Sequence, residues 1–169
     1  AYQAALIVQD LNPGPFEPEH EKLYNESFSQ LTRGQFKRLL ECGKVVELES
    51  GTTLTEERVV CDRLFFVLDG AATLSLNGAH ITTIQPGGFV NTLAVQQGGQ
   101  QKCLGGVPSY GTIRCDRETR AIAWELPKLG ELLQTDRELE RRLNHVLVAA
   151  LMRRLLRSRD GEAVADYIG

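Results

Sequence analysis

The segment from Asp62 to Phe89 constrains the fold of this chain more than any other part of the sequence. Its apolar and β-prone residues come in runs of strand length, and each run ends at a glycine: Gly70, Gly78, then Gly87-Gly88. Asn77-Gly78 is a strong hairpin signal because both residues tolerate a positive φ angle. Regular short strands with glycine at the corners predict a compact β-barrel or β-roll.

Helical patterns and further strands surround this segment. Two short helices are predicted before it, the second capped by Thr32 and stopped at Gly43. After it, Pro127 opens a helix, and the longest helix follows with an apolar stripe at helical spacing. We expect a long surface loop from Val95 to Pro108, because this glycine-rich stretch has no period. The predicted elements are helices at Glu19–Ser29, Thr32–Cys42, Lys128–Gln134 and Asp136–Arg159, and strands at Val45–Leu48, Thr52–Leu54, Leu64–Leu68, Ala72–Leu76, His80–Ile84, Tyr110–Arg114 and Thr119–Trp124.

These elements predict one domain with an arm and a tail. Residues 1–20 form the N-terminal arm, 21–160 the domain, with the roll at about 45–124 and C-terminal helices at 127–159, and 161–169 the tail. Three prolines interrupt the arm between Asn12 and Pro18, so it cannot be regular there. Leu6, Ile7 and Val8 are too apolar to favour water, and we expect them to dock on this domain or on a neighbour.

Bulk composition excludes some functions. The chain has 169 residues and a formal net charge of −3, which argues against general nucleic-acid binding. No run of 18 apolar residues occurs, so we expect no membrane-spanning segment. The compartment stays open: we expect a soluble intracellular protein, cytosolic or organellar after removal of a targeting peptide, because the chain lacks an initiating Met.

Metal and catalytic chemistry find no support in the sequence. The four cysteines form no C-x-x-C pair, which favours reduced structural thiols, and the three histidines are scattered. A metal-binding β-roll enzyme would need a His-x-His pair with a carboxylate. With no metal ligands and no nucleophile–base pair, we expect no catalytic residues and no enzymatic activity.

The glycine-punctuated strands resemble the β-roll of cyclic-nucleotide-binding domains. The family pattern "L-F-x-V-x-x-G" followed by "N-G … I … I-x-P-G-x-F" corresponds to Leu64–Gly70, Asn77-Gly78 and Pro86–Phe89. The chain is most similar to the Popeye branch, through Asp62-Arg63-Leu64 and Ala123-Trp124 among other positions. The resemblance covers roughly Tyr24 to Arg157. It implies a mainly β fold with flanking helices (α+β), a β-roll of jelly-roll type with N-terminal helices and a long C-terminal helix.

The resemblance also implies a place for a ligand, cAMP or cGMP, in the centre of the roll. If that site is retained, Phe89, Asn91, Thr92, Tyr110 and Thr112 would lie at the ligand.

The charged residues of the family's site are missing from this chain. Val90 and Asn91 stand where the family has a glycine and an acid that accepts the ribose hydroxyl. Ser109 and Tyr110 precede Thr112 where the family has an arginine for the phosphate. The two acids of the Popeye signature are absent as well. Because a charge-assisted hydrogen bond contributes about 1.5–3 kcal/mol, this loss should weaken phosphate binding at least about tenfold to a hundredfold.

Two non-enzymatic functions therefore compete. One is a scaffold or accessory interaction module that needs no cofactor, with the fold kept and the phosphate-binding residues lost. The alternative is a regulatory sensor that still binds cAMP or cGMP in the roll. The missing arginine and acid favour the first.

The last long helix is the predicted partner-binding element. It carries seven arginines against two glutamates from Arg137 to Arg159, an excess unusual in an acidic protein. We expect Arg153, Arg154 and Arg157 to flank its apolar stripe and to meet acidic residues of a protein partner, in a larger complex or a homodimer. Contact with an anionic membrane surface is the less favoured alternative, because the stripe lacks aromatic anchors.

Overall fold

The fold was analysed in a computed structural model, which describes residues 16–98 and 108–159. The predicted docking segment Leu6–Val8 lies outside the described residues. The helical elements are α2 (Pro18–Leu23), the π-helical turn η1 (Tyr24–Phe28), α3 (Arg33–Cys42), α4 (Thr92–Gly98), α5 (Leu126–Thr135) and α6 (Arg137–Arg159). The strands are β1 (Lys44–Leu48), β2 (Thr53–Thr55), β3 (Arg63–Asp69), β4 (Ala72–Leu76), β5 (Ala79–Ile84), β6 (Phe89–Val90), β7 (Thr112–Cys115) and β8 (Thr119–Glu125).

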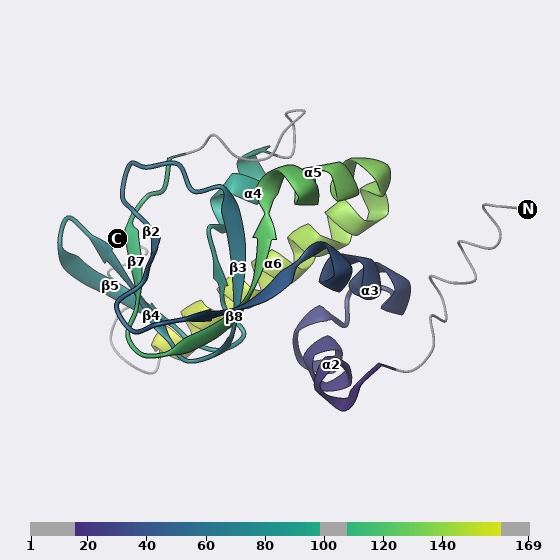
Figure 1. Ribbon diagram of the computed structural model, residues 1–169, viewed down its shortest axis with the longest axis horizontal. Helices are drawn as coiled ribbons and strands as arrows, with labels where there is room; N and C mark the ends of the chain where they lie inside the picture. The colour runs from purple at the N-terminus through teal and green to yellow at the C-terminus, as the bar shows by residue number, and fades with distance from the viewer. Residues whose placement is uncertain (1–15, 99–107, 160–169) are drawn as a thin grey trace, which may run out of the picture.

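The strands form two four-stranded antiparallel sheets that face each other as a roll. Their orders are β1-β8-β3-β6 and β2-β7-β4-β5. In Figure 1 the helices α2, α3 and α5 gather at one end, and α6 runs from that end toward β4 and β5. The hairpin between β4 and β5 turns at Asn77 and Gly78, whose φ angles are 52° and 82°. The predicted β-roll with flanking helices is confirmed.

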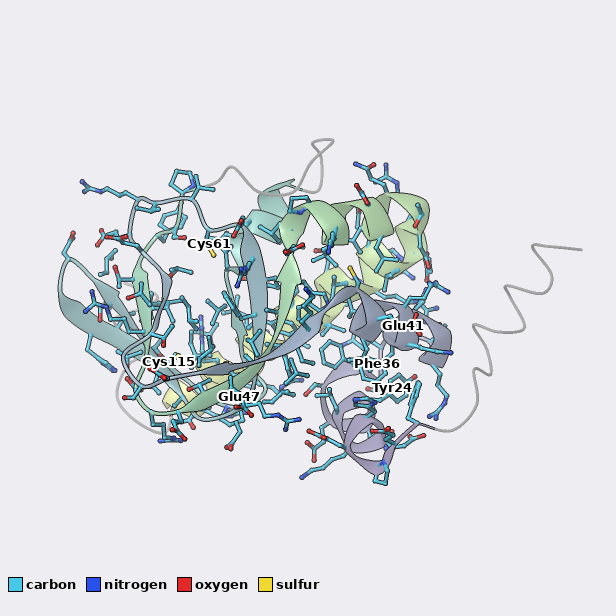
Figure 2. The ribbon with its side chains drawn as sticks, viewed as in Figure 1. Tyr24, Phe36, Glu41, Glu47, Cys61 and Cys115 are labelled. Atoms are coloured by element: carbon cyan, nitrogen blue, oxygen red, sulfur yellow. The ribbon has the colours of Figure 1, made fainter. Side chains whose placement is uncertain are left out.

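Side-chain alternation along β3 divides the core into two parts. Leu64 and Phe66 point to the helices, where they join a cluster rich in aromatic residues, whereas Phe65 and Val67 point into the roll. The roll interior is filled by smaller aliphatic side chains from both sheets. Figure 2 shows Phe36 and Tyr24 at the helical end and Cys61 and Cys115 at the roll.

Trp124 explains a difference from the predicted helix stop. Gly43 ends α3 in an extended conformation, with φ −103°, rather than in the left-handed one expected of a stop glycine. A Cβ atom at Gly43 would lie 2.6 Å from Nε1 of Trp124, which donates a 2.8 Å hydrogen bond to the carbonyl of Leu39. Close approach of the indole, rather than backbone freedom, thus requires glycine here. Trp124 is a core residue with 1% of its surface exposed.

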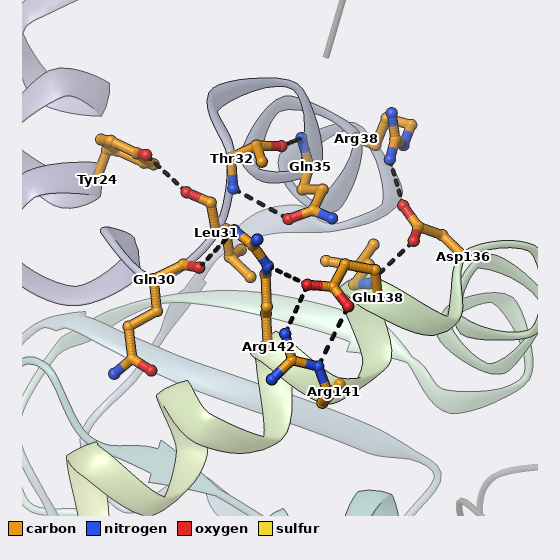
Figure 3. A network of polar contacts seen from close by, with 11 residues as sticks. Tyr24, Gln30, Leu31, Thr32, Gln35, Arg38, Asp136, Glu138, Arg141 and Arg142 are labelled. Carbon is orange, nitrogen blue, oxygen red and sulfur yellow. Dashed lines mark hydrogen bonds and ion pairs between the residues drawn. The ribbon is translucent and has the colours of Figure 1, made fainter. Parts of the chain in front are cut away.

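Polar contacts fix the start of α6 to the N-terminal helices (Figure 3). Asp136 caps α6 by accepting a 3.0 Å hydrogen bond from the backbone N–H of Leu139, and it pairs with Arg38 of α3. Arg142 donates to the carbonyl of Gln30 at 3.3 Å. Thr32 caps α3 in a reciprocal arrangement with Gln35, as the sequence led us to expect at Thr32. The first half of α6 is therefore held in place by the rest of the domain.

One prediction about the helices was wrong in part. Val95–Gly98 is the end of helix α4, not loop, because Ala94 and Val95 are buried against the aromatic cluster and hold this short helix in place.

The apolar stripe of the last helix is covered by the domain over most of its length. Its buried members are Leu139, Leu143, Val146, Leu147 and Ala150, whereas Leu151 is 43% exposed. A partner at the exposed part of the helix stays a prediction. No described helix has both the length and the apolar character needed to cross a bilayer.

Candidate functional site

A cavity of about 140 Å³ lies where the resemblance placed a ligand, between the roll and α6. Thr55, Leu74, Ile84 and Ile113 line it from the strands, and Arg154 lines it from α6. The remaining wall comes from Phe89 and residues 91–93 and from residues 108–111. Ligand sites in proteins usually measure about 300–1,000 Å³, so this roll cavity is small for a nucleotide.

Four of the five predicted ligand residues meet at the roll cavity. Phe89, Asn91, Thr92 and Tyr110 line it, and Thr112 does not. The hydroxyl of Thr112 instead accepts a 3.1 Å hydrogen bond from the backbone N–H of Glu57. The side chain of Thr112 thus helps to join β7 to the bend after β2, and its contact with a ligand stays a prediction.

The side chain of Asn91 is hydrogen-bonded to the backbone around it. Its φ angle is 74°, a left-handed conformation that asparagine tolerates better than most residues. Its Nδ2 donates to the carbonyl of Arg63 at 2.8 Å and to that of Cys61 at 3.1 Å. An acid at this position could not donate these two bonds. Asn91 thus holds the start of α4 against the residues just before β3 and at its start.

Phe89 and Tyr110 have opposite environments in the roll cavity. Phe89 is 6% exposed and packs at 4.9 Å between ring centroids against Phe66 and at 6.0 Å against Phe28. Tyr110 is 70% exposed at the rim. Phe89 is therefore a core residue whose edge reaches the cavity, whereas Tyr110 is open to solvent.

Ser109 and Arg154 were not among the predicted ligand residues, although both line the roll cavity. The hydroxyl of Ser109, at the place of the family's arginine, is buried and makes no hydrogen bond within the described structure. Arg154 reaches the cavity from α6. The sequence signal for Arg154 was the run of arginines on the last helix, which we assigned to a partner contact rather than to the roll.

Neither metal nor thiol chemistry is indicated at this site. Within residues 16–98 and 108–159, no group of three potential metal ligands is close enough to hold an ion. Cys61 accepts a hydrogen bond from Asn91 at its carbonyl, and its Sγ lies 3.5 Å from the carbonyls of Leu54 and Arg63. Burial raises the pKa of the Cys61 and Cys115 thiols, so both stay protonated at neutral pH.

The second half of α6 has two different faces. Its outer face exposes Val148, Leu151, Met152 and Leu156, each between 43% and 56%. The helical period places Arg153, Arg154 and Arg157 on the other side, where they line a groove along β5. The three arginines therefore face the groove, and the partner contact predicted for them stays a prediction.

The comparisons with known proteins bear on the fold. No model of a known protein family matches the chain, and no curated protein does. Among solved structures, the chain is similar to a protein from Geobacter metallireducens described as cyclic nucleotide-binding, with 19% identity, a TM-score of 0.68, and 83% of this chain and 99% of that chain covered. A cyclic nucleotide-binding domain from Methylobacillus flagellatus gives 15% identity, a TM-score of 0.64, and coverage of 83% and 82%.

A third similar structure contains a nucleoside. It is the regulatory subunit of a cAMP-independent protein kinase A from Trypanosoma cruzi bound to guanosine, with 18% identity and a TM-score of 0.55. The match covers 68% of this chain and 40% of that chain. At these identities the comparisons establish that the chain has the fold of cyclic-nucleotide-binding domains. They do not bear on the Popeye resemblance, which stays a prediction.

Proposed function

We propose that this chain is a non-enzymatic scaffold or accessory interaction module, built on a cyclic-nucleotide-binding fold whose roll no longer serves a cyclic phosphate. Three features support the loss of the phosphate site. The roll cavity is small, the amide of Asn91 is hydrogen-bonded to a backbone carbonyl, and the uncharged Ser109 stands at the arginine position. The Trypanosoma cruzi structure supports a fold of this type without a cyclic-phosphate ligand, because the guanosine bound there has no phosphate group.

The observation that carries the interaction function is the outer face of α6. Val148, Leu151, Met152 and Leu156 form an exposed apolar surface on a helix whose first half is fixed to the domain. A contiguous exposed apolar surface is typical of a protein–protein interface. The partner, a second copy of the chain or another protein, would cover this face.

One observation favours the alternative, a sensor of cAMP or cGMP. Arg154 lines the roll cavity from α6 and brings a positive charge to it. Ser109, which stands where the family has its arginine, brings none. In that case Arg154 would pair with the cyclic phosphate, and ligand binding would draw α6 toward the roll. The two functions differ in one measurable quantity, the affinity for cyclic nucleotides.

Calorimetric titration with cAMP and cGMP decides between them. The interaction module predicts no saturable heat, or dissociation constants near the millimolar range, because the two charged partners of the ligand are absent. A dissociation constant in the low micromolar range would instead establish the sensor.

Charge introduced on the outer face tests the interface itself. Val148→Glu/Met152→Glu should abolish self-association in sedimentation equilibrium, or abolish retention of the natural partner in affinity capture, because a buried unpaired charge is costly. Val45→Glu/Val59→Glu is the matched control, since both valines are exposed on other elements. Equal behaviour of the two variants and the wild type would refute the interface.

A further inference from the structure

A second hollow lies between α6 and the edge strand β5, outside the roll cavity. Its volume is about 430 Å³, within the range of sites that hold small ligands. One wall is α6 with Ala150 and the three arginines, and the other is β5 with Thr82 and Thr83. Gln85 and the turn at Gly87-Gly88 close one end. We call this hollow the arginine groove.

Positive charge is concentrated in the arginine groove. Arg153 and Arg157 are four residues apart on one face of α6, and like charges at that spacing repel each other. Arg154 adds a third charge. None of the described residues that line the groove is acidic. An anion in the groove would relieve this repulsion and so would bind favourably.

The arginines of the first half of α6 are used differently. Glu138 accepts hydrogen bonds from Arg141 at 2.6 Å and from Arg142 at 2.7 Å, and Arg137 pairs with Glu140 at 3.3 Å. These arginines have carboxylates of the same helix as partners. Arg153 and Arg157, by contrast, have no acidic residue beside them among the described residues that line the groove.

The donors in the groove suit a phosphate group. A guanidinium presents its N–H groups as a planar fork that matches two oxygens of a phosphate. Thr82, Thr83 and Gln85 line the facing wall, and the hydroxyl of Thr83 lies 3.4 Å from Nε2 of His80. The backbone N–H groups of Gly87 and Gly88 already donate to the carbonyls of Val67 and Gln85, at 2.8 and 3.0 Å. Recognition would therefore come from side chains.

We propose that the arginine groove binds a small molecule that carries a multiply charged phosphate group, such as a diphosphate. The volume fits a small molecule, and Arg153 and Arg157 can balance two negative charges. This site is independent of the proposed loss of the roll site: either can fail while the other stands. The roll cavity and the groove share only Arg154 among their described lining residues.

The probe is pyrophosphate. Its binding is measured by calorimetry at a constant ionic strength that is set with sodium chloride. The wild type should bind it saturably, and Arg153→Gln/Arg157→Gln should weaken binding about tenfold to a hundredfold, because each lost fork removes charge-assisted hydrogen bonds. Arg137→Gln/Arg141→Gln removes the same charge from the same helix and should change the dissociation constant less than about twofold. Thermal unfolding without ligand verifies that both variants are folded.

A third variant separates geometry from charge. Arg153→Lys/Arg157→Lys keeps both charges but loses both forks, and it should bind pyrophosphate with an intermediate affinity. Absence of saturable binding by the wild type would overturn the proposal. So would equal weakening in the groove variant and the Arg137/Arg141 control, because the attraction would then be general rather than local.

Discussion

The roll cavity and the arginine groove lie on two sides of Arg154, and they differ in almost every property that decides what a site can bind. The roll cavity is about 140 Å³, is lined largely by apolar side chains, and has its asparagine committed to backbone carbonyls. The groove is about 430 Å³ and is lined by three arginines of α6 and by two threonines of β5. The fold offers a place for a ligand in the roll, whereas this chain gathers its arginines in the groove. The two places are therefore different.

Truncation of Phe89 should have the largest effect, because it would turn the roll cavity into a larger hole. Phe89→Ala should lower the free energy of unfolding by about 3–5 kcal/mol, and Phe89→Leu by less, since Phe89 packs against Phe28 and Phe66. Denaturant unfolding gives both values. Pyrophosphate binding at the groove should not change. A loss below about 1 kcal/mol would mean that Phe89 is a ligand contact rather than core.

Asn91 offers the next largest effect and separates a structural role from a ligand role. Asn91→Ala should cost about 1–3 kcal/mol, because two carbonyls lose their donor, and about 1 kcal/mol more for the left-handed backbone. Asn91→Gly keeps the backbone freedom and should cost less than Asn91→Ala.

Asn91→Asp restores the acid that the family has at this position. The account predicts that it destabilises the domain and adds no affinity for cAMP, since a carboxylate cannot donate to the carbonyls of Cys61 and Arg63. A stable aspartate variant that binds cAMP more tightly would make Asn91 a lost ligand residue instead.

A smaller effect is expected from the hydroxyls of the groove. Thr83→Val should weaken pyrophosphate binding by roughly twofold to tenfold, the value of one hydrogen bond of about 0.5–1.5 kcal/mol. Thr73→Val is the control, because its hydroxyl lies in the same sheet and bonds to Asp116 at 2.7 Å. Equal dissociation constants for both variants and the wild type would remove β5 from the site.

The smallest effect is expected on the pKa of Glu138, which pairs with Arg141 and Arg142. Hydrogen bonds from Arg141 and Arg142 lower the pKa of Glu138 to about 2, against an ordinary value of 4.5. Because the folded value is the lower one, this pairing stabilises the fold above about pH 4.5, and the contribution is lost as the pH falls toward 2. An NMR titration of the Glu138 carboxyl should show this low pKa, and Arg141→Gln should raise it. A midpoint near 4.5 in the wild type would mean that these arginines are not paired in solution.

The roll could be predicted from the sequence because its signals are local. Asn77-Gly78 turns where it was expected, and the wholly apolar run Leu64–Leu68 forms β3, which is buried on both faces. Helix α4 was missed because its sequence has no helical period of its own, and burial of Ala94 and Val95 against distant residues holds it. That burial is a property of the assembled domain.

The candidate site was only partly predictable. Four of the five predicted ligand residues line the roll cavity, since the motif fixes their places along β6 and α4 and before β7. The direction of the Thr112 hydroxyl depends on how β7 lies beside Glu57, which no motif records. The arginine excess of α6 was visible in the sequence, but the face of the helix that would meet the roll was not.

The most direct test of the account is the location at which cAMP acts, read from the NMR resonances of backbone amides and arginine side chains during a titration to millimolar concentration. The account predicts weak shifts confined to the groove, at Thr82, Thr83, Arg153 and Arg157, because cAMP is an anion and the charge lies there. The resonances of Thr92, Ser109 and Tyr110 should stay in place. Saturating shifts at these three residues in the low micromolar range would contradict the account and establish the roll as a working cyclic-nucleotide site.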